Sequence, residues 1–332
     1  MSIVRNQIIK GPAKITYRGA TFFSRDDVNL ELGYDTFDIA SSAHGKVDER
    51  AVARRANVSF TPIGEWTDLA VLWPYGSFNM GQSIFHPPNY PSFLTEPDQA
   101  LVIHSIAGEQ ITLHSAAITQ MPDLDLSAQR TAIGNVSFSC IGTDNVAWET
   151  ANSLMTVAAV AFNTDDLGLL NLASIKTVPI TAVWAGAAAP WDAIQSISGF
   201  RVSFNLATNP IETDTDGVVD MIVANIGVQA SFQPLGVTET ELVTAMSIQG
   251  NTAVKRGASM QALGALTGTD LTLSGPATGD PEIALTEVFL KSGGISWGAA
   301  SPRMGQFTFI ATRTFVGGTG APDPLFTVGS KA

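Results

Sequence analysis

Strict alternation of apolar and polar residues is the most regular pattern in this chain. Val136, Phe138 and Cys140 alternate with small polar residues, and Phe307 and Phe309 alternate with Gln and Thr in the same way. Successive side chains of a β-strand point to opposite faces of a sheet, so this pattern predicts strands with one buried face. The chain is therefore expected to be built mainly from β-sheet.

Two pairs of short apolar runs have the spacing of β-hairpins. Leu101–Ile103 and Ile111–Leu113 flank a turn that contains Gly108. Leu271–Leu273 and Ile283–Leu285 flank a longer loop rich in Gly and Pro. Because glycine and proline favour the backbone angles of turns, each pair predicts a hairpin.

Helical periodicity is confined to two short segments. Trp66, Leu69 and Trp73 form one apolar stripe, and Pro74 predicts the end of that helix because proline lacks the backbone donor that a helix needs. The segment Thr238–Glu241 has the spacing of a capping box, in which two side chains satisfy free N–H groups at a helix start. Each short helix is expected to lie against a sheet.

The two halves of the chain share landmarks in the same order. The five pairs lie 167, 167, 172, 172 and 171 positions apart: Tyr17–Ala20 with Trp184–Ala187, Phe37–Ile39 with Phe204–Leu206, Val58–Gly64 with Ala230–Gly236, Ile111–Leu113 with Ile283–Leu285, and Gly134–Phe138 with Gly305–Phe309. Such a period predicts two tandem copies of one domain. Chance similarity is the alternative, because β proteins in general contain apolar–Ser/Thr–apolar triplets.

The repeat divides the chain into three parts. A first β-domain is expected over residues 1–145, a packed connector over 146–178, and a second β-domain with a C-terminal arm over 179–332. The connector contains Leu154–Ala161 and Leu167–Leu170, which are too apolar for a free linker. The length of 332 residues agrees with two domains.

Charge and cysteine content narrow the classes of function. The formal net charge is −12, which argues against a protein that wraps nucleic acid by neutralising phosphates. Cys140 is the single cysteine, which excludes a disulfide framework within the chain and favours a reducing compartment. The sequence has no signal-peptide core and no long apolar stretch, so a soluble cytosolic protein without a membrane partner is expected.

Patterns of catalytic or metal-binding residues are incomplete. Gly294–Gly298 places Ser296 where a nucleophile elbow has its serine, but that chemistry needs a later histidine and the last one is His114. Asp214–Gly217 begins like a calcium loop yet lacks the bidentate glutamate, and the histidines are too scattered for a local metal motif. We therefore predict a protein that is not an enzyme, with no catalytic residue, no cofactor and no metal.

Two equivalent loops, residues 40–56 and 207–221, differ in charge. The first mixes bases with acids and the second has acids alone, and these are the candidate contact residues: Lys46, Asp48, Glu49, Arg50, Arg54 and Arg55 in the first loop, and Glu212, Asp214, Asp216 and Asp220 in the second. Complementary charge fixes partner and register more than it adds affinity. The loops are expected to meet across subunit or ring boundaries, and solvated loops are the alternative.

The segments Val58–Leu69 and Ala230–Glu241 each combine a strand with the start of a short helix. This step, repeated with a long hairpin loop in each half, resembles the tail tube proteins of long-tailed, siphovirus-type bacteriophages and their relatives in contractile injection machines. The resemblance covers most of the chain through loose hydrophobic patterns, and the duplication departs from the common single-domain form. It implies two tandem tail-tube-like β-sandwich or barrel domains, each with one short α-helix and a long hairpin loop.

The resemblance also implies a structural protein of the virion tail, made in the host cytoplasm. Three chains would close a pseudo-hexameric ring with 3 × −12 = −36 charges, and stacked rings would form a hollow tube. Expected partners are further copies of the chain, the terminator, baseplate and tape-measure proteins, and DNA that passes through an acidic lumen without tight binding. The alternatives are a phage neck, baseplate or capsid decoration protein, and a bacterial hydrolase or carbohydrate-binding protein with Asp123 and Asp125 as weak catalytic candidates.

Overall fold

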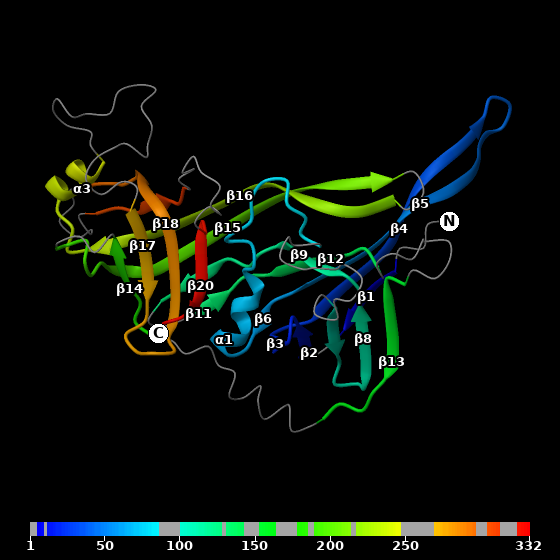
Figure 1. Cartoon of the computed structure of the whole chain (residues 1–332), viewed down its shortest axis with the longest axis horizontal. Helices are drawn as coiled ribbons and strands as arrows, with labels where there is room; N and C mark the ends of the chain where they lie inside the picture. The colour runs from blue at the N-terminus through cyan, green and yellow to red at the C-terminus, as the bar shows by residue number, and fades with distance from the viewer. Residues whose placement is uncertain are drawn as a thin grey trace, which may run out of the picture.

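The computed structural model describes residues 5–9, 12–85, 100–127, 131–142, 153–163, 178–184, 189–213, 217–246, 269–296, 304–312 and 324–332. The fold is mainly β, which confirms the prediction from the alternating pattern. Curled sheets form a half-barrel, and two long hairpins run to one side of the molecule (Figure 1).

The first half of the chain forms two packed sheets. Its elements are β1 (Arg5–Ile9), β2 (Lys14–Tyr17), β3 (Ala20–Ser24), β4 (Val28–Ser41), β5 (Gly45–Phe60), β6 (Pro62–Ile63), α1 (Trp66–Leu69), a 3-10 turn (Ala70–Leu72), β7 (Leu101–His104), β8 (Glu109–Leu113), β9 (Ala116–Gln120), β10 (Leu124–Leu126), β11 (Thr131–Ile133), β12 (Val136–Cys140) and β13 (Met155–Ala159). One sheet has the order β1-β4-β5-β12-β9 and the other β13-β8-β7-β2-β3-β6. Tyr17 of β2 meets Phe138 of β12 with ring centroids 5.0 Å apart, so the two sheets enclose one core.

The second half forms a single sheet that folds over itself. Its elements are β14 (Thr181–Trp184), β15 (Gln195–Thr213), β16 (Gly217–Leu235), α3 (Glu239–Ala245), β17 (Thr269–Ser274), β18 (Pro281–Ser292), β19 (Phe307–Ile310) and β20 (Phe326–Ser330). The order is β11-β10-β15-β16-β19-β18-β17-β14, with β20 beside β18. Trp184 of β14 packs on Phe309 of β19 at 4.9 Å between centroids, so the fold brings both ends of the sheet around a core.

Strand order repeats between the halves. The order β4-β5-β12-β9 corresponds to β15-β16-β19-β18, and β8-β7-β2 corresponds to β18-β17-β14. The hairpin register repeats as well, since Leu30 pairs with Val58 and Val202 pairs with Ala230, each 172 positions later. The landmarks found in the sequence therefore mark equivalent strands of one repeated architecture.

One of the five landmark pairs, Phe37–Ile39 with Phe204–Leu206, is misaligned. Phe204 pairs with Val228 in the same way as Leu32 pairs with Ala56, so the equivalent of Phe204–Leu206 begins at Leu32 and not at Phe37. The sequence comparison matched two similar Phe-x-aliphatic triplets. The hydrogen-bond register, which the pattern of side chains does not fix, decides the alignment.

A sharp corner carries each half from one layer to the other. Ser115 lies between β8 and β9, and Glu287 lies 172 positions later within β18. Both have φ of +46°, a value uncommon for residues with a side chain. Strand β18 thus passes from one layer to the other as a single strand, whereas the first half uses two strands, β8 and β9.

The last strand of each half also repeats. Val157 of β13 pairs with Ile111 of β8, and Val328 of β20 pairs with Ile283 of β18. Strand β13 lies in the range expected to be a connector and β20 in the expected arm, so both segments contribute a strand to a sheet. The domain boundaries themselves stay a prediction.

The predicted short helices are confirmed. Trp66 and Leu69 face the core from α1, and a 3-10 turn follows before Trp73. At α3 the capping box is present, because Thr238 Oγ1 accepts from the N–H of Glu241 and the Glu241 carboxylate accepts from the N–H of Thr238. Among the described residues, no helix has the length and apolar character to cross a membrane.

The two halves join edge to edge. Strand β10 of the first half pairs with β15 of the second, with Leu124 opposite Val202. Beside it, the carboxylate of Asp123 accepts from the backbone N–H of Phe204 at 3.2 Å and from Ser203 Oγ at 3.3 Å. Carboxylate-to-backbone bonds of this kind are charge-assisted, so they favour one register at the junction.

A second contact at the junction joins α1 to β20. Trp66 Nε1 donates a hydrogen bond to the carbonyl of Gly329, and the N–H of Leu325 donates to the carbonyl of Gly76 at 2.7 Å. Phe326 is almost fully buried here, at 1% exposure. The last strand of the chain therefore packs against the first half.

Candidate functional site

The segment expected to be the loop 40–56 is a β-ribbon. Strands β4 and β5 pair from Asn29↔Ser59 out to Ser41↔Gly45, so the turn is short. The outer part, residues 33–55, leaves the body of the molecule (Figure 1), and none of its side chains whose burial is described is buried. We call it the first ribbon. The predicted long hairpin is present, but residues 40–56 are not an irregular loop, because the two strands satisfy each other's backbone groups beyond the edge of the sheet.

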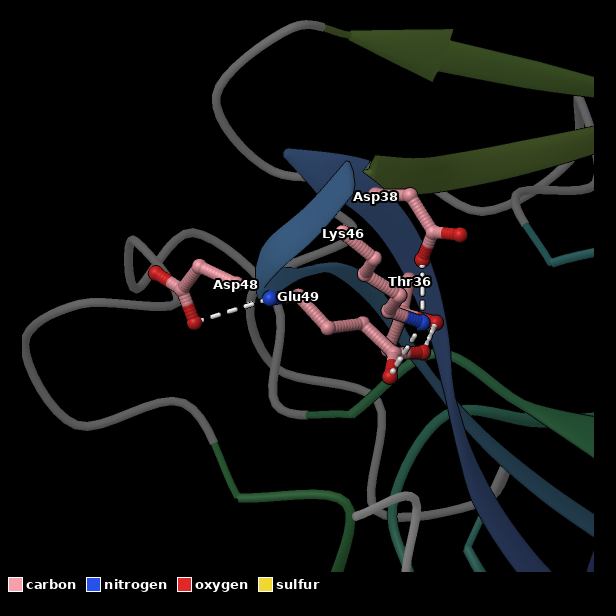
Figure 2. Close-up of polar contacts among 5 residues, drawn as sticks. All are labelled: Thr36, Asp38, Lys46, Asp48 and Glu49. Carbon is pink, nitrogen blue, oxygen red and sulfur yellow. Dashed lines mark hydrogen bonds and ion pairs between the residues drawn. The ribbon is translucent and has the colours of Figure 1, made fainter. Parts of the chain in front are cut away.

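A polar cluster occupies one face of the ribbon near its tip (Figure 2). Lys46 Nζ lies 2.5 Å from Asp38 Oδ1 and 3.1 Å from Glu49 Oε2. Thr36 donates its hydroxyl proton to Glu49 Oε1, and Asp48 Oδ1 accepts from the N–H of Glu49 at 2.8 Å. The structure thus brings the side chains of Lys46 and Glu49 together, engaged with each other, while Asp48 lies on the other face and contacts the backbone of Glu49.

Hydrogen bonding shifts the pKa of two members of this cluster. The hydrogen bonds to Asp38 and then to Glu49 raise the pKa of Lys46. The hydrogen bond from Thr36, followed by the one from Lys46, lowers the pKa of Glu49. Exposed ion pairs contribute little to overall stability, so the cluster mainly sets the conformation of the tip.

The opposite face of the ribbon carries exposed apolar residues together with Arg50 and Asp48. The register places Phe37 opposite Arg50 and Ile39 opposite Asp48. Phe37 is 60% exposed and the nearby Val47 is 53% exposed. An isolated two-stranded hairpin is marginally stable in water, and exposed apolar groups on it are typical of a docking element. Within the part of the chain that the structure describes, Arg50 has no ion pair.

Arg54 and Arg55 lie at the base of the first ribbon and not at its tip. Arg54 is opposite Tyr34, and Arg55 is opposite Gly33. Partial burial lowers the pKa of Arg54, while Arg55 is exposed. The structure therefore separates these two residues from the cluster around Lys46.

The segment 207–221 is also β-structure. Strands β15 and β16 pair as far as Thr213↔Gly217, with the exposed Glu212 opposite Val218. This corrects the second loop prediction for the same reason as the first. Of its acidic candidates, Asp214 and Asp216 lie outside the described residues.

The second hairpin is held against the first half of the chain, in contrast to the first ribbon. The carboxylate of Asp220 accepts from Ser83 Oγ at 2.6 Å and from the N–H of Met221 at 2.7 Å. The N–H of Ile84 donates to the carbonyl of Met221 at 2.9 Å, and Ser83 forms an isolated bridge with Ile222. Equivalent hairpins thus have different surroundings, and Asp220 serves an intramolecular contact.

The outward face of the first-half sheet is polar but almost uncharged. A cavity of about 390 Å³ separates it from the second hairpin, where Thr208 and Met221 line the opposite wall. The polar residues on the sheet side of the cavity are Asn29, Glu31, Asn57, Ser59, Thr119, Ser137 and Ser139. Glu31 is the one acid among them. The outward positions of this face therefore carry mainly hydroxyl and amide groups.

The candidates for catalysis or metal binding lie apart in the structure. Ser296 follows Ile295, which bridges Met304, and the residues after it, where an elbow needs its helix, are outside the described range. No cluster of metal-ligating side chains occurs among the described residues. Cys140 is a buried core residue, and Asp123 is engaged in the junction between the halves.

Thr36, Phe37 and Asp38 are not among the contact residues predicted from the sequence. These residues precede the expected loop, yet they form the ribbon together with the predicted contact residues. Strand propensity gives little signal here, because residues 40–51 are mostly Ala, Ser, Lys, Asp and Glu; only Gly45 marks a turn.

No model of a known protein family and no curated protein matches this chain. The repeated sandwich and the projecting ribbon therefore carry the functional interpretation.

Proposed function

We propose that this chain is a structural virion protein whose copies close into rings of three and stack into a hollow tail tube. The observation that carries the proposal is the first ribbon, which extends from a packed body with Phe37 and Val47 exposed. A protein that acts alone gains nothing from such an element, whereas a stacking protein needs one. Copies in the next ring would cover the exposed face.

The internal repeat supports a closed ring of three chains. Each half presents the same strand order, so three chains supply six similar units around one axis. Closure pairs the free edges of the curled sheets, which removes the aggregation hazard of open strands. The exposed apolar residues of β13 would be covered in the same step.

The polar outward faces of the repeated sheets are proposed to form the wall of the channel. Ser59 and Ser137 of the first half correspond to Ser231 and Thr308 of the second, so hydroxyl groups stand at equivalent positions in both halves, although Ser231 is buried in the single chain. The lining of the first-half face contains no lysine or arginine that would release counterions from DNA, and on the second half the exposed Arg201 is paired with Asp123. With 3 × −12 = −36 charges on each ring, DNA would slide without tight binding.

In this role the partners are other copies of the chain, the terminator, baseplate and tape-measure proteins of the tail, and DNA in transit. The protein would be made in the host cytoplasm and would end in the virion. It would work without enzymatic activity, cofactor or membrane contact.

Electron microscopy of the purified protein tests the proposal. Wild-type protein at high concentration is expected to form rings of three-fold symmetry and hollow filaments. In the matched variant, Asn-Gly replaces residues 35–53, so that Tyr34 and Arg54 close a two-residue turn. This variant is expected to keep a folded body and to form rings, because no described side chain of the deleted segment is buried, but to form no filaments.

Filaments of normal length from the shortened variant would contradict the stacking role of the ribbon. Rings without filaments from the wild type would favour the alternative of a neck or baseplate protein. Monomers at every concentration would contradict the assembly role altogether.

A further inference from the structure

The junction between the two halves of one chain is a template for the junction between neighbouring chains. In a ring built from a duplicated domain, the two kinds of junction alternate and are quasi-equivalent. The first half supplies β10 to the outer edge of β15. The second half must then supply its equivalent of β10 to the outer edge of β4 in the next copy.

The second half does contain an equivalent of β10. In the first half, Leu124 pairs with Ile133, and the N–H of Gly134 donates to the carbonyl of Asp123 at 2.7 Å. In the second half, Ile295 bridges Met304, and the N–H of Gly305 donates to the carbonyl of Gly294 at 2.7 Å. Each of these residues lies 171 positions after its counterpart. The segment 294–296 thus has the same backbone geometry as the start of β10.

The receiving edge is occupied by β1. Strand β10 pairs with Phe200–Val202 of β15, whose equivalent in the first half is Val28–Leu30 of β4. In the single chain, β1 pairs with this same stretch in the same antiparallel direction, with Ile9 opposite Val28 and Gln7 opposite Leu30. One edge of a strand accepts one partner at a time.

We propose that residues 294–296 of one copy pair with the β4 edge at Val28–Leu30 of a second copy, and that β1 holds this edge until the neighbour displaces it. The proposal rests on the proposed ring assembly and names its lateral contact. An occupied edge keeps the single chain from pairing with unrelated strands, which is the hazard of an open edge.

The exposure of strand β13 is a second argument for a neighbouring copy at this edge. Its equivalent β20 packs against α1 across the junction within the chain, where Trp66 donates to the carbonyl of Gly329. Phe326 of β20 is 1% exposed and Val328–Ser330 are half-buried, whereas the equivalent Met155 of β13 is only half-buried and Val157–Ala159 are exposed. The difference is expected if α3 of the copy that supplies residues 294–296 covers β13 of the copy that supplies the β4 edge, as α1 covers β20 within the chain.

The two junctions differ in their polar contacts. Asp123, whose carboxylate binds the N–H of Phe204 and the hydroxyl of Ser203, has Gly294 as its equivalent. The junction between chains therefore lacks this charge-assisted contact. A weaker contact between chains than within a chain allows each copy to fold first and to assemble afterwards.

Cysteine cross-linking tests the pairing directly. Asp125 lies opposite Arg201 within the chain, so the pair Ser296→Cys and Asn29→Cys is expected to lie opposite between chains. When the assembled Ser296→Cys/Asn29→Cys variant is oxidised, it is expected to give covalent dimers and trimers. Under reducing conditions the gel should show the single chain again. The matched control, Thr278→Cys with Asn29→Cys, places one cysteine in the exposed turn before β18 and is expected to give none.

A reversible lock tests the role of β1. Asn6 and Glu31 are opposite in the register, so Asn6→Cys with Glu31→Cys is expected to tether β1 to β4 on oxidation. Loss of rings in the oxidised protein, with full recovery after reduction in the same sample, is the expected result. Circular dichroism before and after reduction serves as the control, and the two spectra are expected to be the same.

Wild-type rings seen by microscopy, combined with unlinked Ser296→Cys/Asn29→Cys chains or with normal ring formation by the locked variant, would overturn this inference and leave the tube proposal standing. Absence of rings from the wild type and from every variant would overturn both.

Discussion

Individual backbone positions decide how the two halves fit together. Gly76 lies where its backbone meets β20, and a Cβ added there would collide with the carbonyl oxygen of Phe326. Ser115 and Glu287 take the same positive φ at the corner between layers. These residues serve the architecture through their backbones, which explains why they stand outside any side-chain pattern.

Gly76→Ala is expected to destabilise the protein by about 1–3 kcal/mol, because an added methyl group at a packed site forces a backbone shift. The measurement is the free energy of unfolding in urea, followed by tryptophan fluorescence. Gly33→Ala is the matched control, since its Cβ would have no atom within 4 Å. Equal stability of the two variants would show that β20 does not pack on residue 76 in solution.

Acid is expected to loosen the tip of the first ribbon. The pKa of Glu49 is lowered, so its stabilising effect is present above its ordinary value of 4.5 and is lost as the pH falls through the lowered pKa. The pKa of Lys46 is raised, so its effect is present below 10.5 and is lost as the pH rises through the raised pKa. Hydrogen exchange of the tip amides, corrected for intrinsic rates, should therefore increase below pH 4.5.

Glu49→Gln should show the faster tip exchange already at neutral pH, while Glu31→Gln, in the body of β4, should not. Unchanged tip exchange in Glu49→Gln would mean that the cluster does not order the ribbon.

At the scale of elements, the same hairpin is used in two ways. The second is anchored through Ser83 and Asp220, and the first projects with one polar face and one face that carries exposed apolar residues. Duplication therefore gives one chain an element for its own cohesion and another for its neighbours. Only the projecting copy is expected to respond to changes in assembly conditions.

Arg50→Glu is expected to weaken filament formation without changing the fold. Arg50 is exposed beside Phe37, and surface substitutions usually alter stability by about 0.5 kcal/mol or less. Sedimentation of filaments should show a loss of polymer that is greatest at low salt, where charge acts furthest. Arg25→Glu, in the exposed turn before β4, is the control, and an equal loss in both variants would point to net charge as the cause.

At the scale of the whole molecule, net charge and local surface disagree. The chain carries −12 overall, yet the polar face of the first-half sheet is lined mostly by hydroxyl and amide groups. Repulsion of DNA by a tube would then come from the summed charge of the ring, while the wall itself offers neither strong attraction nor strong repulsion.

Assembled wild-type protein is expected to show no measurable salt-dependent affinity for duplex DNA. Ser59→Lys places one cation per chain on the proposed wall and should create binding that falls with salt, in tubes but not in monomers. Filter binding at several salt concentrations measures both. Tight binding by wild-type tubes, or equal binding by monomers and tubes of Ser59→Lys, would contradict the wall assignment.

The sequence by itself determined the β class, the two short helices with the capping box at Thr238, and the repeat. Each of these depends on neighbouring residues or on the two-residue period of a strand, which fixes the face that a side chain takes. Tertiary structure alone decided that residues 40–56 form a ribbon, that Leu32 and not Phe37 corresponds to Phe204, and that β13 and β20 complete equivalent sheets. The physical reason is that strand partners and register depend on backbone hydrogen bonds between distant segments. The side-chain pattern of one segment does not specify which other segment it pairs with.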